Sequence, residues 1–226
     1  MPLNISKVGK VLKTLNRLNT PTEFNATLPV KIEIKKEINP ITYLIKLGNR
    51  ETETKSYIPL EVGKKYLAQI KEFKNRIQIT NLKELPKLME ILEKTNIPEG
   101  FKHYNKKEIL KHLSISKDKN EFMFFANLLL ALEKEIYHLS IKENNKKSLM
   151  QYKYTKNKVS FYSVFSNLGE IEGEIFSYKA VIISPYKNVI ELIKHHKKEI
   201  ELEIKTILKE PKPLYEFKNS LLDLKV

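Results

Sequence analysis

The sequence contains no cysteine and no tryptophan, and only six glycines occur among its 226 residues. The lack of cysteine excludes disulfides, thiolate catalysis and metal sites with cysteine ligands. So few glycines leave no Gly-rich loop for a phosphate or a dinucleotide, and the nucleophile elbow of the α/β-hydrolases is missing as well. We therefore expect no cofactor and none of the enzyme classes that depend on these motifs.

Long hydrophobic runs are also missing. The longest candidate, Phe122 to Leu132, is interrupted by Asn127 and is shorter than the about 20 residues that a membrane-spanning helix needs. Lys7, Lys10 and Lys13 break any apolar signal-peptide region near the N-terminus. The sequence thus predicts a cytoplasmic protein with no membrane span, and it leaves open export by a route that needs no cleaved signal.

Arginine is scarce although the formal net charge is +14. Only Arg17, Arg50 and Arg76 are arginines, and lysine supplies the other basic positions. Specific nucleic-acid sites favour arginine, because its planar fork bonds bases in pairs and stacks on them. The lysines are interleaved with glutamates along the whole chain, so we interpret the charge as a solvated surface with a general attraction to polyanions.

The five histidines do not form a metal-binding pattern. Two ligands on one helix face need a spacing of three or four residues, whereas His195 and His196 are adjacent and point about 100° apart. Glu191 has the correct spacing to His195, but one such pair is common on a charged helix. We expect no metal site, and no catalytic residue can be named.

Glu170, Glu172 and Glu174 alternate along one predicted strand, so their carboxylates share one face of it. Such an acidic ladder could bind a cation or a basic partner. It is more typical of the solvated face of an antiparallel sheet, where lysines of the neighbouring strand lie opposite the glutamates.

The hydrophobic pattern predicts an α+β protein in four parts. Five short alternating runs, separated by Gly, Asn and Pro, favour a small β-barrel-like domain, closed or partly open, with a plain antiparallel meander as the alternative. After a helical middle segment, further alternating runs predict an antiparallel sheet packed on an amphipathic helix over Asn188 to Leu208. The four parts are an N-terminal helix and linker (1–27), the β-barrel-like domain (28–82), a helical linker region (83–134) and a C-terminal α/β domain (135–226).

Capping signals divide the middle segment. Asn105 is a predicted N-cap, with Glu108 as its capping-box partner. Asp118 or Asn120 is expected to cap the next helix, Glu121 to Lys134. That helix is apolar on most faces, so we expect it to be buried.

The most informative pattern lies between Val159 and Tyr186. Two alternating strands flank a turn that contains Leu168 and Gly169, and a third strand then leads into the amphipathic helix. Gly169 permits a backbone conformation that a Cβ atom would penalise. This order resembles the C-terminal domain of the flagellar hook-length control protein family. The segments Tyr43 to Gly48 and Ile58 to Tyr66 resemble the small β-domain found upstream in shorter members.

The resemblance implies a non-enzymatic role in flagellar type III export. The implied partner is the cytoplasmic domain of the export-gate switch protein, or a small homologue of it, and Leu168 and Gly169 would form the structural turn of the family motif. Two departures stand out. Phe165 occupies a position where long members often have proline, and the Pro/Gln-rich ruler segment is missing. The chain therefore resembles a short member that acts on the substrate switch without measuring length.

A second interpretation is a basic barrel that binds single-stranded nucleic acid. Aromatic residues for stacking (Tyr43, Tyr57, Tyr66 and Phe73) and nearby lysines (Lys64, Lys65, Lys71 and Lys74) lie in the β-barrel-like region. Tyr43 shares its face with Ile45 and Leu47, which favours core packing for that residue. This interpretation stays the alternative.

Overall fold

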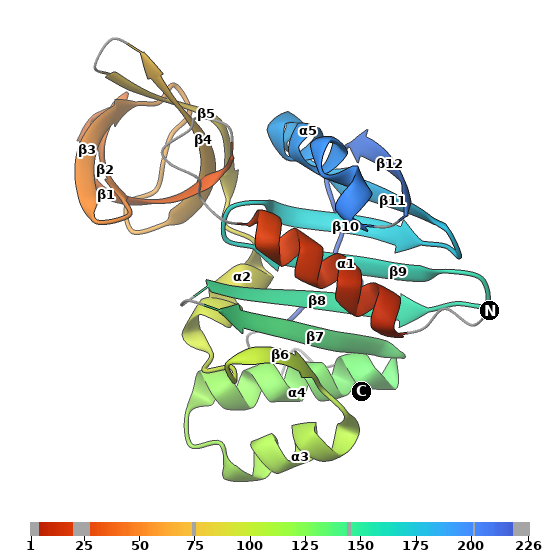
Figure 1. Cartoon of the computed structure of the whole chain (residues 1–226). Helices are drawn as coiled ribbons and strands as arrows, with labels where there is room; N and C mark the ends of the chain where they lie inside the picture. The colour runs from red at the N-terminus through yellow and green to blue at the C-terminus, as the bar shows by residue number, and fades with distance from the viewer. Residues whose placement is uncertain (1–4, 20–27, 74–75, 144–145, 201, 219–226) are drawn as a thin grey trace.

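The structure is a computed structural model that describes residues 5–19, 28–73, 76–143, 146–200 and 202–218. The described strands form two separate sheets, one of five strands and one of seven, and most of the regular structure is β (Figure 1). Within the described residues, five α-helices lie between and around these sheets.

The five strands expected between residues 28 and 82 are confirmed, and they make up the small sheet. All pairs in it are antiparallel, in the order β3-β2-β1-β4-β5. The strands are β1 (Val30–Asn39), β2 (Thr42–Leu47), β3 (Arg50–Lys55), β4 (Lys65–Phe73) and β5 (Arg76–Glu84). Gly48 has a φ of 58° in the turn between β2 and β3, a backbone conformation that is unfavourable for residues with a side chain.

The expected β-barrel-like domain needs correction, because the small sheet is rolled but does not close into a barrel (Figure 1). Two bulges bend β1, between Ile34 and Lys36 and between Glu37 and Asn39, and bulges increase twist and curvature. The edges β3 and β5 come near each other, but no ladder joins them among the described residues. Closure requires edge strands in matching register. Here β3 has only six residues, and a register shift between Leu67 and Gln69 displaces β5.

The small sheet encloses its own core of eight buried residues: Ile32, Ile34, Tyr43, Ile45, Leu47, Leu60, Tyr66 and Ala68. Two buried tyrosines fasten the loop that precedes β4. The backbone N–H of Leu60 donates to the Tyr43 hydroxyl at 3.3 Å, and that of Glu61 donates to the Tyr66 hydroxyl at 3.2 Å. These bonds hold Leu60 over the apolar interior.

The large sheet has the order β12-β11-β10-β9-β8-β7-β6. All its pairs are antiparallel except β11 with β12, which run parallel and are connected through α5 (Lys187–His195). The strands are β6 (Gly100–His103), β7 (Ile136–Glu143), β8 (Lys146–Tyr154), β9 (Val159–Phe165), β10 (Gly169–Ile175), β11 (Lys179–Ser184) and β12 (Glu203–Leu208).

Helices cover both faces of the large sheet. Helices α1 (Ile5–Leu18) and α5 lie on the near face in Figure 1. The opposite face is covered by α2 (Lys87–Lys94) and α4 (Lys119–Glu133), and α3 (Lys106–Ile115) packs on α4. Side chains of both layers join one continuous core, which includes Leu12 of α1 and Phe124 of α4.

The predicted helical middle segment is wrong in two respects. It contains strand β6, which pairs with β7 and extends the large sheet. Its helices α2 and α4 contribute buried side chains to the core of that sheet, so the segment is a covering layer and not a linker. The apolar faces of α4 had indicated burial, and Phe124, Phe125 and Leu128 are fully buried.

The predicted C-terminal arrangement also needs correction. The helix expected over Asn188 to Leu208 ends at His195, and after a 3-10 turn the chain enters β12. The sheet is accordingly mixed, with one parallel pair at its edge. The apolar spacing at Ile200, Ile204 and Ile207 suited a helix. Ile204 and Thr206 also alternate with Glu203 and Lys205, and such β-branched residues favour an edge strand.

Two of the predicted helix caps are confirmed. The Asn105 side chain accepts a bond from the backbone N–H of Glu108 at 3.0 Å, and Asp118 accepts from Asn120 and Glu121 at 2.9 and 3.0 Å. Within the described ranges, no helix has both the length and the apolar character needed to cross a membrane.

Candidate functional site at the junction of the two sheets

The Leu168-Gly169 turn lies where the two sheets meet. Leu168 is completely buried, and Gly169 has a φ of 70°. A Cβ atom on Gly169 would lie 2.8 Å from the ring of Tyr186, which precedes α5, and 3.5 Å from Leu67 of the small sheet. The turn therefore requires glycine for its backbone angle and for its close approach to Tyr186.

Asn19, at the end of α1, fastens this turn. Its side-chain oxygen accepts from the backbone N–H of Asn167 at 2.7 Å, and its amide nitrogen donates to the Ser166 hydroxyl at 3.1 Å. The Asn167 side chain donates in return to the Asn19 carbonyl at 2.8 Å. Asn19 is fully buried, so these bonds satisfy polar groups that have no access to water.

A carboxyl group is partly buried next to the turn. The Tyr162 hydroxyl donates to Glu170, and Lys83 of the small sheet forms an ion pair with Glu210 nearby. Burial raises the pKa of Glu170, and the negative charge of Glu210 adds to this, while Tyr162 and Lys83 oppose it. Burial also raises the pKa values of Tyr162 and Tyr186, so both hydroxyls stay protonated.

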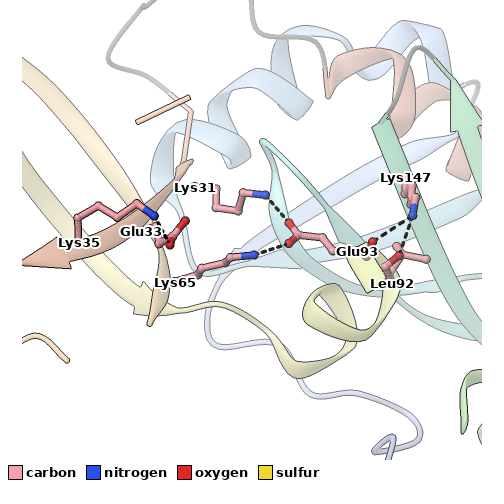
Figure 2. A network of polar contacts seen from close by, with 7 residues as sticks. All are labelled: Lys31, Glu33, Lys35, Lys65, Leu92, Glu93 and Lys147. Atoms are coloured by element: carbon pink, nitrogen blue, oxygen red, sulfur yellow. Dashed lines mark hydrogen bonds and ion pairs between the residues drawn. The ribbon is translucent and has the colours of Figure 1, made fainter. Parts of the chain in front are cut away.

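The two sheets share a second polar contact around Glu93 of α2 (Figure 2). Its carboxylate accepts from Lys31 of β1 at 2.5 Å and from Lys65 of β4 at 3.2 Å. Burial of Glu93 opposes ionisation, but the two lysines outweigh it and hold its pKa below the ordinary value. One helix of the large layer thus bridges two strands of the small sheet.

Lys147 of β8 anchors the other end of this contact. Its ammonium group donates to the carbonyls of Leu92 and Glu93, at 3.3 and 3.2 Å (Figure 2). It also donates to the carbonyl of Thr95 at 2.5 Å. A cation at the C-terminus of a helix stabilises the helix dipole and satisfies free carbonyls. Because α2 is fixed to the large sheet in this way, its Glu93 holds the small sheet in a defined position.

The predicted glutamate ladder is present on β10, and each carboxylate has a partner within the chain. Glu170 accepts from Tyr162, Glu172 accepts from the backbone N–H of Lys212 at 2.8 Å, and Glu174 forms an ion pair with Lys158. These contacts favour the structural interpretation of the ladder over a cation site.

The described residues contain no group of three or more acidic or histidine side chains that could hold a metal ion. His195 and His196 lie next to each other at the end of α5, and Nδ1 of His196 donates to the Glu199 carboxylate at 2.7 Å. His138 lies elsewhere, fully buried in β7, where burial lowers its pKa to about 3.

The residues of the nucleic-acid alternative are only partly available. Tyr43 and Tyr66 are buried and bond to the backbone, whereas Tyr57 is 88% exposed. Lys64 pairs with Glu61 and Glu84, and Lys65 pairs with Glu93. The side chains of Lys71 and Phe73, and the whole of Lys74, lie outside the described residues. The alternative stays a prediction.

The sequence interpretation identified Leu168 and Gly169 but missed what surrounds them. Asn19, Leu67 and Tyr186 come from three different parts of the chain, and no local pattern links them to the turn. Glu93 and Lys147 were missed for the same reason. Among these, Asn19 carried a weak signal, because an asparagine directly after an amphipathic helix is a common terminal residue.

The junction consists of hydrogen bonds, ion pairs and apolar contacts, an arrangement suited to fixing the two sheets relative to each other. Compared with protein-family models, curated proteins and solved structures, the chain finds no match.

Proposed function

We propose that the protein is a non-enzymatic component of flagellar type III export, which acts on the substrate switch by binding another protein. The partner is the cytoplasmic domain of the export-gate switch protein or a small homologue of it. Binding, without a chemical step, changes the export apparatus from rod and hook substrates to filament substrates.

One observation carries the proposal. Strands β9, β10 and β11 and helix α5 follow one another in the order of the hook-length control motif, with Leu168 buried and Gly169 at a positive φ in the turn. The motif residues are enclosed by Tyr186 and Asn19, so they shape the domain. We expect the partner to contact other surfaces of the large sheet and its helices.

A binding experiment tests the proposal. The purified full-length protein is mixed with the purified cytoplasmic domain of the switch protein from the same organism, and complex formation is measured by pull-down and by calorimetry. We expect a complex that persists at 300 mM salt. At that ionic strength, screening would weaken a purely electrostatic association, so persistence indicates specific contacts.

The control is an unrelated folded protein with the same net charge, which should not bind. If the folded protein shows no association beyond that of the control, the export-switch proposal is wrong. Strong salt-dependent binding to single-stranded DNA in a parallel titration would favour the nucleic-acid alternative instead.

A further inference from the structure

The chain after β12 crosses the large sheet as an extended segment, which we name the C-terminal strap (residues 209–218). It contains neither helix nor strand. The strap contacts β10 through Lys212 and Glu172, β8 through Tyr215 and Gln151, and α4 through Lys218 and Asn127. It therefore runs across the strands on the face that α4 covers, and it does not add a strand to the edge of the sheet.

Two buried side-chain amides hold the backbone of the strap. Gln151 donates to the carbonyl of Tyr215 at 2.8 Å and accepts from its N–H at 3.0 Å. Asn127 does the same for Lys218, at 2.9 and 2.8 Å. Each amide thus satisfies both backbone groups of one residue. These contacts recognise an extended backbone and place no requirement on the side chain at that position.

Two aromatic side chains fill the groove between the amides. Phe217 is 3% exposed, and its ring centre lies 5.9 Å from that of Phe124 in α4 and 5.6 Å from that of His138 in β7. The Tyr215 ring lies 5.8 Å from that of Phe217, with the Lys134 ammonium group 5.5 Å away. Glu216, between the two aromatics, is exposed.

The strap therefore shows a simple chemical pattern: two buried aromatic side chains at alternate positions, with an exposed residue between them. Asn127 and Phe124 belong to α4, His138 to β7 and Gln151 to β8, and none of these elements includes the strap. Release of the strap breaks no ladder of the sheet. Pro211 and Pro213 lie in the first half of the strap, and neither has an N–H group for pairing.

We propose that this groove is a peptide-binding site, and that the C-terminal strap is a resident occupant that an extended, aromatic-x-aromatic segment of a partner protein replaces. The peptide site stands on the contacts above, whereas the identity of the partner rests on the proposed export function. Such a site uses backbone recognition for affinity and alternate side-chain pockets for specificity, as other peptide-binding domains do.

Hydrogen exchange on the full-length protein tests whether the strap is released. We expect the amides of Tyr215 and Lys218 to exchange at least 100-fold faster than those of Met150 and Gln151 in the middle of β8, because local opening exposes them without unfolding the sheet. Equal protection of the strap and β8 would mean that the strap leaves only on global unfolding, which overturns the proposal.

A peptide titration tests the groove itself. The probe is a labelled synthetic peptide of residues 211–218, added to a chain that ends at Glu210. We expect this truncated chain to bind the peptide at least tenfold more tightly than the full-length protein does, because the strap no longer competes. If the truncated chain does not fold, the full-length variant Tyr215→Ala/Phe217→Ala takes its place. Absence of binding by the folded protein overturns the proposal.

Matched peptides report on specificity. Replacing both aromatics by alanine (Tyr215→Ala and Phe217→Ala) should weaken binding at least tenfold. Replacing the exposed position (Glu216→Ala) should change it less than twofold. Equal losses from both changes would show that the peptide does not occupy the groove in the geometry of the strap.

The switch-protein domain then connects the two proposals. We expect it to bind the chain that ends at Glu210 more tightly than the full-length protein, and the 211–218 peptide to compete with it. Peptide binding with no switch-domain binding would refute the export function and leave the peptide site intact. Switch-domain binding that is indifferent to the peptide would refute the groove as its site and leave the export function intact.

Discussion

All strands of the small sheet come from residues 30–84, and its core consists of side chains from these strands and from the loop before β4. The large sheet, in contrast, needs segments from both ends of the described chain. Helix α1 covers one of its faces, and the C-terminal strap crosses the other. The small sheet is thus assembled by contacts that are mostly local in sequence. The large sheet depends on long-range contacts, and its stability should respond to changes far from its strands.

Two glycines give the sharpest test of this difference. A Cβ atom on Gly173 of β10 would collide with the backbone carbonyl of Val181 and lie 2.6 Å from the Phe161 ring, whereas Gly48 has open space around it. We expect Gly173→Ala to lower the free energy of unfolding by about 3 kcal/mol or more, since overpacking of a core shifts backbone. Gly48→Ala should cost about 1 kcal/mol for its left-handed backbone alone.

Denaturant titrations followed by circular dichroism measure both variants. Equal costs for Gly173→Ala and Gly48→Ala would contradict the close contacts that surround Gly173 in the large sheet.

Shortening a buried side chain of α1 tests how much this helix stabilises the large sheet. Leu12 is fully buried in the core shared with β7 to β10. We expect Leu12→Ala to cost about 3 kcal/mol, from lost burial and the cavity left behind. Hydrogen exchange should show the loss of protection in β7 to β9 and little change in β1 and β2. A uniform loss in both sheets would show instead that they unfold as one unit.

Acid should destabilise the large sheet through His138. Burial holds the pKa of this histidine at about 3 in the folded protein, against an ordinary value of 6.5. Below pH 6.5 the unfolded chain binds a proton that the folded chain does not. Stability therefore falls as the pH is lowered, until the folded pKa is reached. The expected contribution is about 1.4 kcal/mol per pH unit between pH 6 and pH 5.

The variant His138→Gln isolates this contribution, with His195→Gln at an exposed position as the control. The free energy of unfolding measured between pH 7 and pH 5 should depend less on pH in the first variant and keep its full dependence in the second. An unchanged slope in His138→Gln would contradict a neutral buried histidine.

The smallest expected effect concerns the contact between the sheets. Glu93→Gln removes the charge that Lys31 and Lys65 share. These side chains are partly exposed, so we expect a loss of about 0.5–1 kcal/mol that shrinks in 0.5 M salt. Glu90→Gln, an exposed change on the same helix, should have no measurable effect. A salt-independent loss at Glu93 would indicate that packing, and not charge, joins the sheets.

The sequence predicted those features that depend on neighbouring residues. Alternation along β2 and β9, the Gly48 turn and the Asn105 cap were all readable, because each is set within a few positions of the chain. The five strands of the small sheet were recognised for the same reason.

Features set by distant contacts were not predictable in this way. The end of α5 and the start of β12 depend on pairing with β11, which the helical spacing of Ile204 and Ile207 concealed. Whether β3 pairs with β5 depends on bulges that no local sequence pattern indicates. In the candidate site, the turn was found, but Tyr186 and Asn19, which enclose it, come from elsewhere in the fold.

The bonds between Asn19 and the Ser166-Asn167 turn join residues 147 positions apart. During synthesis the ribosome therefore completes α1 long before its binding place exists. At typical elongation rates the delay is roughly 7–30 seconds. For that time a short basic helix with an apolar face is free to bind chaperones or other polypeptides. The bonds between Asn19 and this turn can thus form only after residue 167 has emerged from the ribosome.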